Sequence, residues 1–316
     1  MTPPRELVVI SGKGGTGKTS VVAAFAALAG GAVLADCDVD AADLHLVLSP
    51  RLGDEHEFSG RDQAIIDPEA CTACGRCAEV CRFAAVLGGP ESGYSIDTIA
   101  CEGCELCRRV CSADAIRMEP VVNGAWMVSE TRFGPLVHAR LGVAEDNSGK
   151  LVTLVRNKAR GVAEEQGLPL VLVDGSPGIG CPVIASLTGA DLVLAVTEPT
   201  VSGRHDLDRV LRVVGQFRLP FAVCINRADL NPELGARIAA EASAAGAAFV
   251  ATVGYDPAVT HAQVAGTDVI AYGGRAAAEI TELWEAVSAS LSPYPGSGPA
   301  ERPRREVPAG EEQRSR

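Results

Sequence analysis

The sequence predicts an α/β fold, a mostly parallel, doubly wound sheet into which a small α+β domain is inserted. Three observations predict it. Short apolar runs alternate with helical patterns in both halves of the chain, which is typical of parallel strands covered by helices on both faces. A glycine-rich loop joins the first apolar run to the first helical pattern. Between residues 60 and 120 a cysteine-dense block interrupts the alternation.

Composition describes a folded protein and excludes some partners. The chain has 316 residues, of which 47% are apolar and 22% charged, as in globular proteins. Its net charge of −12 argues against nucleic acid as the main partner, because phosphate backbones require a basic surface. The chain shows neither the apolar core of a signal peptide nor a run long enough to span a membrane, so we expect a cytoplasmic protein without a membrane partner.

The glycine-rich loop is the most specific motif near the start of the chain. It reads SGKGGTGKTS over residues 11–20, after a predicted strand at 7–10 and before a predicted helix at 21–28. This strand–loop–helix context is the one that a phosphate-binding loop requires, because backbone N–H groups and the helix N-terminus then face the phosphates. The pattern predicts Lys18 on the β- and γ-phosphates and the Thr19 hydroxyl on Mg²⁺. The predicted nucleotide-binding residues of the loop are Gly12, Lys13, Gly14, Gly15, Thr16, Gly17, Lys18, Thr19 and Ser20.

A second lysine inside the loop, Lys13, resembles the deviant P-loop of the MinD/ParA and nitrogenase-iron-protein superfamily. The resemblance implies an ATPase fold, with ATP and Mg²⁺ as ligands. It also implies a homodimer, or a heterodimer with a related ATPase, in which Lys13 reaches the nucleotide of the partner. Lys13 and Lys18 are therefore predicted to be catalytic.

The next predicted strand, residues 32–35, ends in Asp36-Cys37-Asp38, where the resembling ATPases have switch I. The resemblance implies that Asp38 orients or deprotonates the attacking water and contributes to the Mg²⁺ site, while Asp36 supports the site. The alternative interpretation is a solvated acidic loop. Residues 49–62 then form a polar stretch that breaks the α/β alternation.

The cysteine block contains the same run twice, thirty positions apart. Its C-x-x-C-x-x-C-x-x-x-C spacing is that of two-cluster bacterial ferredoxins, in which the fourth cysteine of each run binds the other cluster. We therefore predict two [4Fe–4S] clusters, one held by Cys71, Cys74, Cys77 and Cys111, the other by Cys81, Cys101, Cys104 and Cys107. Paired zinc sites are the alternative, although they more often show two C-x-x-C pairs with a longer spacer. Arg82 and Ser112 replace the proline that usually follows the fourth cysteine.

After the cysteine block the pattern returns to α/β. Residues 117–137 predict a hairpin with its turn at Asn123-Gly124, and residues 150–165 predict a helix capped by Ser148 or Asn147. The predicted strand 170–173 ends in Asp174-Gly175-Ser176-Pro177-Gly178. An acidic residue at this end of a strand predicts a site, and we expect Asp174 in the Mg²⁺ shell with the Gly178 amide sensing the γ-phosphate.

Three further strands are predicted at 191–196, 221–225 and 249–253. Asn226 ends the second of them, and the resemblance implies a contact with adenine. Because Asn226-x-x-Asp229 also matches the guanine-reading pattern of GTPases, the residues alone leave the base open. The last predicted helix, 275–291, has an apolar face expected to pack on the core, and the tail 292–316 is predicted to be disordered. That apolar face consists of Ile280, Leu283, Trp284, Val287 and Leu291.

Three cysteines lie outside the block. Cys37 and Cys224 adjoin apolar strands and are interpreted as small core residues. Cys181 follows Asp174 by seven residues, the offset of the subunit-bridging cluster ligand in the nitrogenase iron protein. No second cysteine is evident for such a bridge, so a buried thiol is the simpler interpretation.

Together these features predict four segments: ATPase domain 1–59, inserted two-cluster ferredoxin domain 60–120, ATPase domain 121–291 and tail 292–316. The predicted function is an ATP-binding and ATP-hydrolysing iron–sulfur protein that couples its cycle to electron transfer with a redox partner protein. One alternative is a nucleotide-controlled scaffold or carrier of iron–sulfur clusters. Spatial positioning in the manner of MinD or ParA has less support, because the chain is acidic and has no basic amphipathic tail helix.

Overall fold

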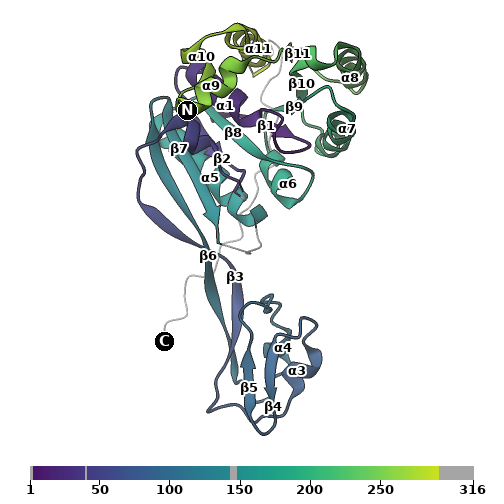
Figure 1. The fold of residues 1–316 in the computed structure, drawn as a ribbon. Coiled ribbons are helices and arrows are strands. Elements are labelled where there is room, and N and C mark those ends of the chain that lie inside the picture. The colour runs from purple at the N-terminus through teal and green to yellow at the C-terminus, as the bar shows by residue number, and fades with distance from the viewer. Residues whose placement is uncertain (1–2, 40, 143–147, 292–316) are drawn as a thin grey trace.

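The computed structural model describes residues 3–39, 41–142 and 148–291. A nine-stranded sheet with helices on both faces makes up the large part of the molecule, and a long pair of strands connects it to a small domain (Figure 1). The tail 292–316, predicted to be disordered, and the predicted helix cap Asn147 lie outside the described residues. Among the described residues, no helix has the length and apolar character needed to cross a membrane.

The order of the strands confirms the predicted mostly parallel, doubly wound sheet. The strands lie in the order β11-β10-β9-β1-β8-β2-β7-β6-β3. Every neighbouring pair from β11 to β7 is parallel, whereas β6 is antiparallel to both β7 and β3. The bounds are β1 Arg5–Ser11, β2 Val33–Asp36, β3 Glu55–Ile66, β6 Ile116–Thr131, β7 Gly134–Leu141, β8 Leu170–Pro177, β9 Leu192–Thr197, β10 Phe221–Asn226 and β11 Val250–Val253.

Helices cover the two faces of the sheet with two separate apolar cores. One core contains side chains of α5 (Ser148–Gln166), α6 (Cys181–Leu187), α7 (Val201–Gln216) and α8 (Pro232–Ala244). The other contains side chains of α1 (Lys18–Leu28), α2 (Leu44–Leu48), α9 (Pro257–Val264), α10 (Val269–Tyr272) and α11 (Arg275–Leu291). A short 3₁₀ helix, Ala228–Leu230, follows β10.

The last helix packs on the core as its pattern predicts. Ile280, Leu283 and Val287 are buried, and Trp284 and Leu291 are half-buried against the same core. The period of 3.6 residues thus identified the buried face of α11 correctly.

The hairpin turn predicted at Asn123-Gly124 is wrong. Both residues lie inside β6, and the turn comes nine residues later, at Arg132-Phe133, where Thr131 pairs with Gly134 of β7. Asn123 is buried, and its side-chain Oδ1 accepts the N–H of Gly60 at 2.8 Å. The Asn-Gly signal assumes a solvent-exposed turn, whereas here the neighbouring strand β3 donates a hydrogen bond to the asparagine Oδ1 inside the sheet.

The small domain forms around the cysteines. It contains α3 (Arg76–Val80), α4 (Leu106–Arg109) and a hairpin of β4 (Val86–Gly89) and β5 (Gly93–Ile96). The far ends of β3 and β6 reach into it and contribute Ala64, Ile66 and Ile116 to its apolar core. The predicted boundaries at residues 60 and 120 lie within these two strands, which run without interruption from the large sheet into the small domain (Figure 1).

A buried histidine links α2 to the base of these long strands. His138 of β7 is within hydrogen-bond distance of Ser129 of β6, with 2.8 Å from Nε2 to Oγ, and its ring stacks on that of His45. Burial, together with the charge of His45, lowers the pKa of His138 to about 4. The imidazole is therefore neutral in the folded protein at neutral pH, while the unfolded chain titrates near pH 6.5.

This difference in pKa predicts a stability loss on acidification. Between about pH 6.5 and pH 4 the unfolded chain binds the additional proton, so the free energy of unfolding falls as the pH falls. From about pH 7.5 to pH 5.5 we expect His138 to account for a loss of about 1.4 kcal/mol. Anaerobic thermal unfolding of the wild type and of His138→Gln at both pH values measures it. Equal losses in the two proteins would contradict the assignment.

Candidate functional site

The phosphate-binding loop adopts a conformation that only glycine allows at its key positions. Gly15 and Gly17 have φ values of 78° and 95°. A Cβ at Gly17 would lie 2.3 Å from Nδ2 of Asn226, and one at Gly12 would lie 2.7 Å from the backbone of Asp206. The amide of Asn226 also donates to the Thr16 carbonyl at 2.8 Å, so β10 holds the loop in place.

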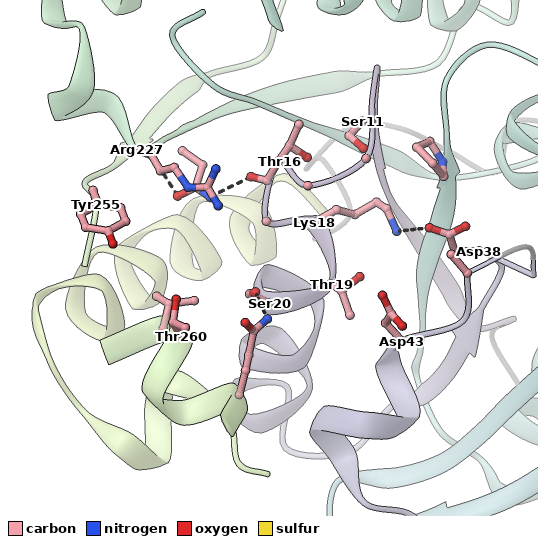
Figure 2. A pocket seen from close by; sticks show the side chains of 18 of the residues that line it. Ser11, Thr16, Lys18, Thr19, Ser20, Asp38, Asp43, Arg227, Tyr255 and Thr260 are labelled. Atoms are coloured by element: carbon pink, nitrogen blue, oxygen red, sulfur yellow. Dashed lines mark hydrogen bonds and ion pairs between the residues drawn. The ribbon is translucent and has the colours of Figure 1, made fainter. Parts of the chain in front are cut away.

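The loop borders a cavity of about 570 Å³ at the carboxyl ends of the parallel strands (Figure 2). A cleft at this edge of an open α/β sheet is the usual ligand site. The predicted site residues that line it are Gly14, Gly15, Thr16, Gly17, Lys18, Thr19, Ser20, Asp38 and Asn226. Gly12, Lys13, Asp174 and Gly178 lie outside this lining.

Lys18 lies buried at the centre of the site between two carboxylates. Its Nζ is 2.5 Å from Oδ1 of Asp174. On the side of the cavity, it is 3.5 Å from Oδ2 of Asp38 (Figure 2). Burial alone would lower the pKa of Lys18, but the charge of Asp174 and its hydrogen bond, with the charges of Asp38 and Asp36, raise it. The lysine therefore stays charged and can bind a phosphate that reaches this position.

Oxygen donors suited to Mg²⁺ converge beside this lysine. The Thr19 hydroxyl donates to Oδ2 of Asp174 at 2.8 Å, and Asp38 faces the same end of the cavity. Hydroxyl and carboxylate oxygens are the ligands that Mg²⁺ prefers in proteins. In addition, the Thr16 hydroxyl is buried in the loop and has no hydrogen-bond partner in the described part of the chain. The residues present thus fit Mg²⁺ together with a phosphate ligand.

Asp36 shapes the turn that carries Asp38. It is fully buried, and its two oxygens accept the N–H groups of Asp38 and Leu44, both at 3.2 Å. Burial, followed by the charge of Asp174, raises the pKa of Asp36 well above its ordinary value. Asp36 therefore holds the backbone between β2 and α2, and Asp38, unlike Asp36, lines the cavity.

The Gly178 amide, predicted to sense the γ-phosphate, has a partner within the chain. It donates to the carbonyl of Ser11 at 2.9 Å, and Gly178 has a φ of 92°. This bond joins the loop after β8 to the start of the phosphate-binding loop. A phosphate can recruit the amide only if this bond opens.

Lys13 points away from the cavity in the single chain. Its Nζ donates to Oε1 of Glu198 at 2.6 Å and to Oγ of Ser202 at 3.1 Å. Burial alone would raise the pKa of Glu198, but the hydrogen bond and charge of Lys13, with those of Arg227, lower it. Glu198 is therefore ionised at neutral pH and neutralises Lys13 within the chain.

The far side of the cavity contains residues that the sequence analysis missed. The loop after β11 and helix α9 contribute Tyr255, Thr260 and Gln263, and Arg227 follows Asn226 (Figure 2). Gln263 donates to the Ser20 hydroxyl at 2.8 Å. The only available signal was position, because a loop after a parallel strand lies at the same edge as the other strand ends.

Asp229, which made guanine an alternative to adenine in the sequence pattern, forms hydrogen bonds within the chain. One of its oxygens accepts the N–H of Tyr255 at 2.7 Å, and the other accepts from Arg275 at 2.8 Å. The Tyr255 hydrogen bond lowers the pKa of Asp229, as does the Arg275 hydrogen bond. Asp229 does not line the cavity, and it fixes the loop that carries Tyr255 instead.

The eight cysteines of the block border two small cavities in the small domain. One is lined by Cys71, Cys74, Cys77 and Cys111, and the other by Cys81, Cys101, Cys104 and Cys107. Each cavity thus takes three cysteines from one run and the fourth from the other, the same division as in the predicted ligand sets. Apolar side chains, among them Ile66, Ile96 and Met118, complete the linings. Thiolate donors around apolar cavities suit iron–sulfur clusters.

These cavities differ from the site of a single ion. Within residues 3–39, 41–142 and 148–291, no three His, Cys, Asp or Glu side chains converge closely enough to hold one metal ion. Each set of four cysteines lines a cavity.

The three remaining cysteines differ in exposure. Cys37 and Cys224 are fully buried in the cores of the sheet, and burial raises the pKa of both thiols, that of Cys224 to about 12. Their environment is that of small core residues, as predicted. Cys181, expected to be buried, is exposed at the first position of α6, whereas Val183 in the same turn is the residue that enters the core.

The fold and the two sites define a class of protein, a P-loop protein with the MinD/ParA fold and an inserted iron–sulfur domain. Residues 64–118 match the 4Fe-4S dicluster domain family. The cell-division ATPase MinD of Pyrococcus furiosus aligns with a TM-score of 0.53 at 18% identity, over 90% of this chain and 98% of its own. The Mg-ADP complex of MinD from Pyrococcus horikoshii gives 0.53 at 18%, over 90% and 96%.

The relatives in sequence are archaeal. The uncharacterized protein MJ0578 of Methanocaldococcus jannaschii is 34% identical over 230 residues, which are 72% of this chain and 79% of MJ0578. MJ0579 of the same organism is 31% identical over 106 residues, 33% of this chain and 38% of its own. The chain belongs to the family of MJ0578.

Proposed function

We propose that this protein binds and hydrolyses ATP and couples the cycle to electron transfer through two [4Fe–4S] clusters. One observation carries the proposal. The strands β3 and β6 belong to the nucleotide-binding sheet and to the cysteine-bearing domain at once, so the two sites share one continuous element (Figure 1). In sequence this insertion lies between Asp38 and Asp174, the carboxylates on either side of Lys18.

The chain's own residues divide the work of hydrolysis. The loop amides and Lys18 bind the phosphates and neutralise their charge. Thr19, Asp174 and Asp38 would hold Mg²⁺, which supplies further neutralisation of the phosphate oxygens when bound. Asp38 also orients the attacking water, since it is the carboxylate nearest to Lys18 that lines the cavity. Phosphoryl transfer depends mainly on such positioning and charge stabilisation.

The surroundings of the cavity favour ATP over GTP. A guanine-reading aspartate must have its carboxylate free to accept from the base, and both oxygens of Asp229 are taken by Tyr255 and Arg275. The occupied amide of Asn226, which donates to the Thr16 carbonyl, does not distinguish the two bases. Tyr255, half-exposed at the cavity edge, offers a ring on which a purine can stack.

In the cysteine-bearing domain, Cys71, Cys74, Cys77 and Cys111 would hold one cluster, and Cys81, Cys101, Cys104 and Cys107 the other. The clusters would supply one-electron chemistry when bound. The chain contributes thiolates, an apolar surrounding and backbone N–H groups, such as that of Ala115, which donates to Sγ of Cys111 at 3.3 Å. Hydrogen bonds to sulfur and exposure to solvent are the means by which a protein sets cluster potentials.

Redox titration tests the coupling. We expect the midpoint potential of at least one cluster to differ by about 60 mV between the ATP and ADP states, which is a tenfold change in a one-electron equilibrium. The measurement is an anaerobic titration, followed by electron paramagnetic resonance, with ATP, ADP or no nucleotide. Equal potentials in all three states, with unchanged electron-transfer rates to an acceptor, would overturn the coupling.

A further inference from the structure

The two strands that connect the domains contain an irregularity at Ser59 and Gly60, which we call the pivot. β3 and β6 pair in regular antiparallel register except on either side of Ser59, where the register shifts and shifts back. On the body side of this point β6 also pairs with β7, starting at Gly124, whereas on the far side it pairs with β3 alone. A two-stranded ribbon therefore leaves the sheet at an irregularity, which is where such a ribbon bends most easily.

Side chains hold this pivot at Gly60. Its N–H donates to Oδ1 of Asn123 at 2.8 Å, and its carbonyl accepts from Nζ of Lys150 at 2.6 Å. Gly60 is buried, so loss of either bond would leave a buried backbone group without a partner. Asn123 is part of the ribbon itself, whereas Lys150 belongs to α5 in the body of the molecule.

The position of Lys150 is not explained by the stability of its helix. It lies in the first turn of α5, where the helix dipole disfavours a cation. Lysine is also rare in this chain, which has only four and otherwise uses arginine. The bond to the ribbon accounts for a lysine at this place.

Helix α5 contacts α6, the helix that follows the loop between Asp174 and Gly178. At one end, Gly149 lies against Cys181, so closely that an added Cβ would come 3.3 Å from the Cβ of Cys181. At the other end, Arg156 donates to the carbonyls of Ala185 and Thr188 at the end of α6. Because α5 contacts both ends of α6, we expect a displacement of α6 to be transmitted to α5.

The start of α6 depends on the loop between Asp174 and Gly178. That loop is held by the Gly178 bond to the Ser11 carbonyl and by Asp174 on Lys18 and Thr19. A phosphate that accepts a hydrogen bond from the Gly178 amide must break the bond of that amide to the Ser11 carbonyl. Mg²⁺ bound by Asp174 must change the contacts of Asp174 with Lys18 and Thr19. Either event displaces the segment that leads into α6 and, with it, α5.

We infer that Lys150 is the positioning residue through which the state of the Asp174–Gly178 loop sets the angle of the β3–β6 ribbon, and so the placement of the cysteine-bearing domain. This inference rests on the proposed function, since it supplies the mechanical link between hydrolysis and the clusters. From Gly60 to the end of β3 the ribbon extends about 20 Å, so a turn of about 10° at the pivot moves its far end by about 3–4 Å.

Hydrogen exchange in the anaerobic holoprotein tests the link directly. In the wild type we expect exchange of peptides covering residues 57–63 and 119–125 to differ at least about threefold between saturating Mg·ATP and Mg·ADP. In Lys150→Met, which keeps the length of the side chain but not its donor, this difference is expected to fall below about 1.5-fold while nucleotide affinity stays within about twofold. Lys150→Arg, which retains a donor, should restore it.

Lys158→Met is the matched control. Lys158 lies on the same helix and carries the same charge, but it sits over the Trp126 ring and is not bonded to Gly60. We expect it to keep the wild-type nucleotide dependence. Retention of that dependence in Lys150→Met, or its equal loss in both variants, would overturn the inference.

The outcome is separable from that of the proposed function. Nucleotide-dependent cluster potentials that persist in Lys150→Met would leave the function intact and remove Lys150 from it. The opposite outcome is also informative. If the cluster potentials of the wild type are the same in all nucleotide states while hydrogen exchange of the ribbon still depends on nucleotide through Lys150, the electron-transfer proposal is overturned and the mechanical link is retained.

Discussion

Replacing Lys13 with alanine is expected to lower the rate of ATP hydrolysis by about 10³-fold while changing ATP affinity by less than about threefold. A cation supplied to the transferred phosphate from a partner is worth rate factors of this size. In the single chain Lys13 lies outside the lining of the cavity, on Glu198 and Ser202, so its loss removes no contact with a nucleotide bound by the same chain. Steady-state hydrolysis and equilibrium binding of a fluorescent ATP analogue measure the two effects.

Two comparisons make the Lys13 result specific. Lys18→Ala should weaken binding as well as hydrolysis, because Lys18 lies within the cavity. Mixing Lys13→Ala with a chain that is defective only at Asp38 should restore part of the activity. In the mixed dimer, the site of the Lys13→Ala chain keeps its own Asp38 and receives Lys13 from the other subunit. Full activity of Lys13→Ala, or of a strictly monomeric protein, would refute the interface role.

Replacing Cys111 with serine is expected to lower the iron content from about eight to about four atoms per chain. The cluster lost should be the one at Cys71, Cys74 and Cys77, although Cys111 belongs to the second run, because these four line the same cavity. The remaining cluster, bounded by Cys81 and the first three cysteines of the second run, should keep its spectrum. Iron analysis and electron paramagnetic resonance of the reduced protein distinguish the two clusters.

Cys181→Ser is the control for this experiment. Cys181 is exposed and belongs to neither cavity, so the variant should retain about eight iron atoms. If Cys181→Ser loses iron and Cys111→Ser does not, the ligand sets proposed for the small domain are wrong.

Much of the fold was predictable because the signals are local. Buried parallel strands appear as short apolar runs, and the runs at 7–10, 170–173, 221–225 and 249–253 all lie in or overlap strands of the sheet. The helix at 275–291 was predicted to the residue, since its apolar stripe repeats with the helical period. The phosphate-loop pattern is local, because it lies within one short loop. The cysteine pattern is nearly as local, because three cysteines around each cavity come from one run and the fourth from the other run, thirty positions away.

Contacts between distant segments were not predictable in the same way. The sequence placed a turn at Asn123-Gly124, where the chain instead continues as a strand, because only the folded sheet puts Gly60 opposite the Asn123 side chain. The part of the cavity formed by Tyr255, Thr260 and Gln263 was missed for a similar reason. These residues carry no motif, and the folded chain brings them to the cavity, where Gln263 of α9 donates to the Ser20 hydroxyl.

The sequence by itself determined the class of fold, and it predicted the phosphate-binding loop and the two cysteine runs. Each of these two motifs depends on spacing within about ten to forty residues of chain. Only the tertiary structure decided how the two chemistries are joined. It showed that Lys13 is held by Glu198, that Asp229 is occupied by Arg275 and that Lys150 reaches the carbonyl of Gly60. These contacts connect residues 46 to 185 positions apart, and the packing of whole helices and strands creates them.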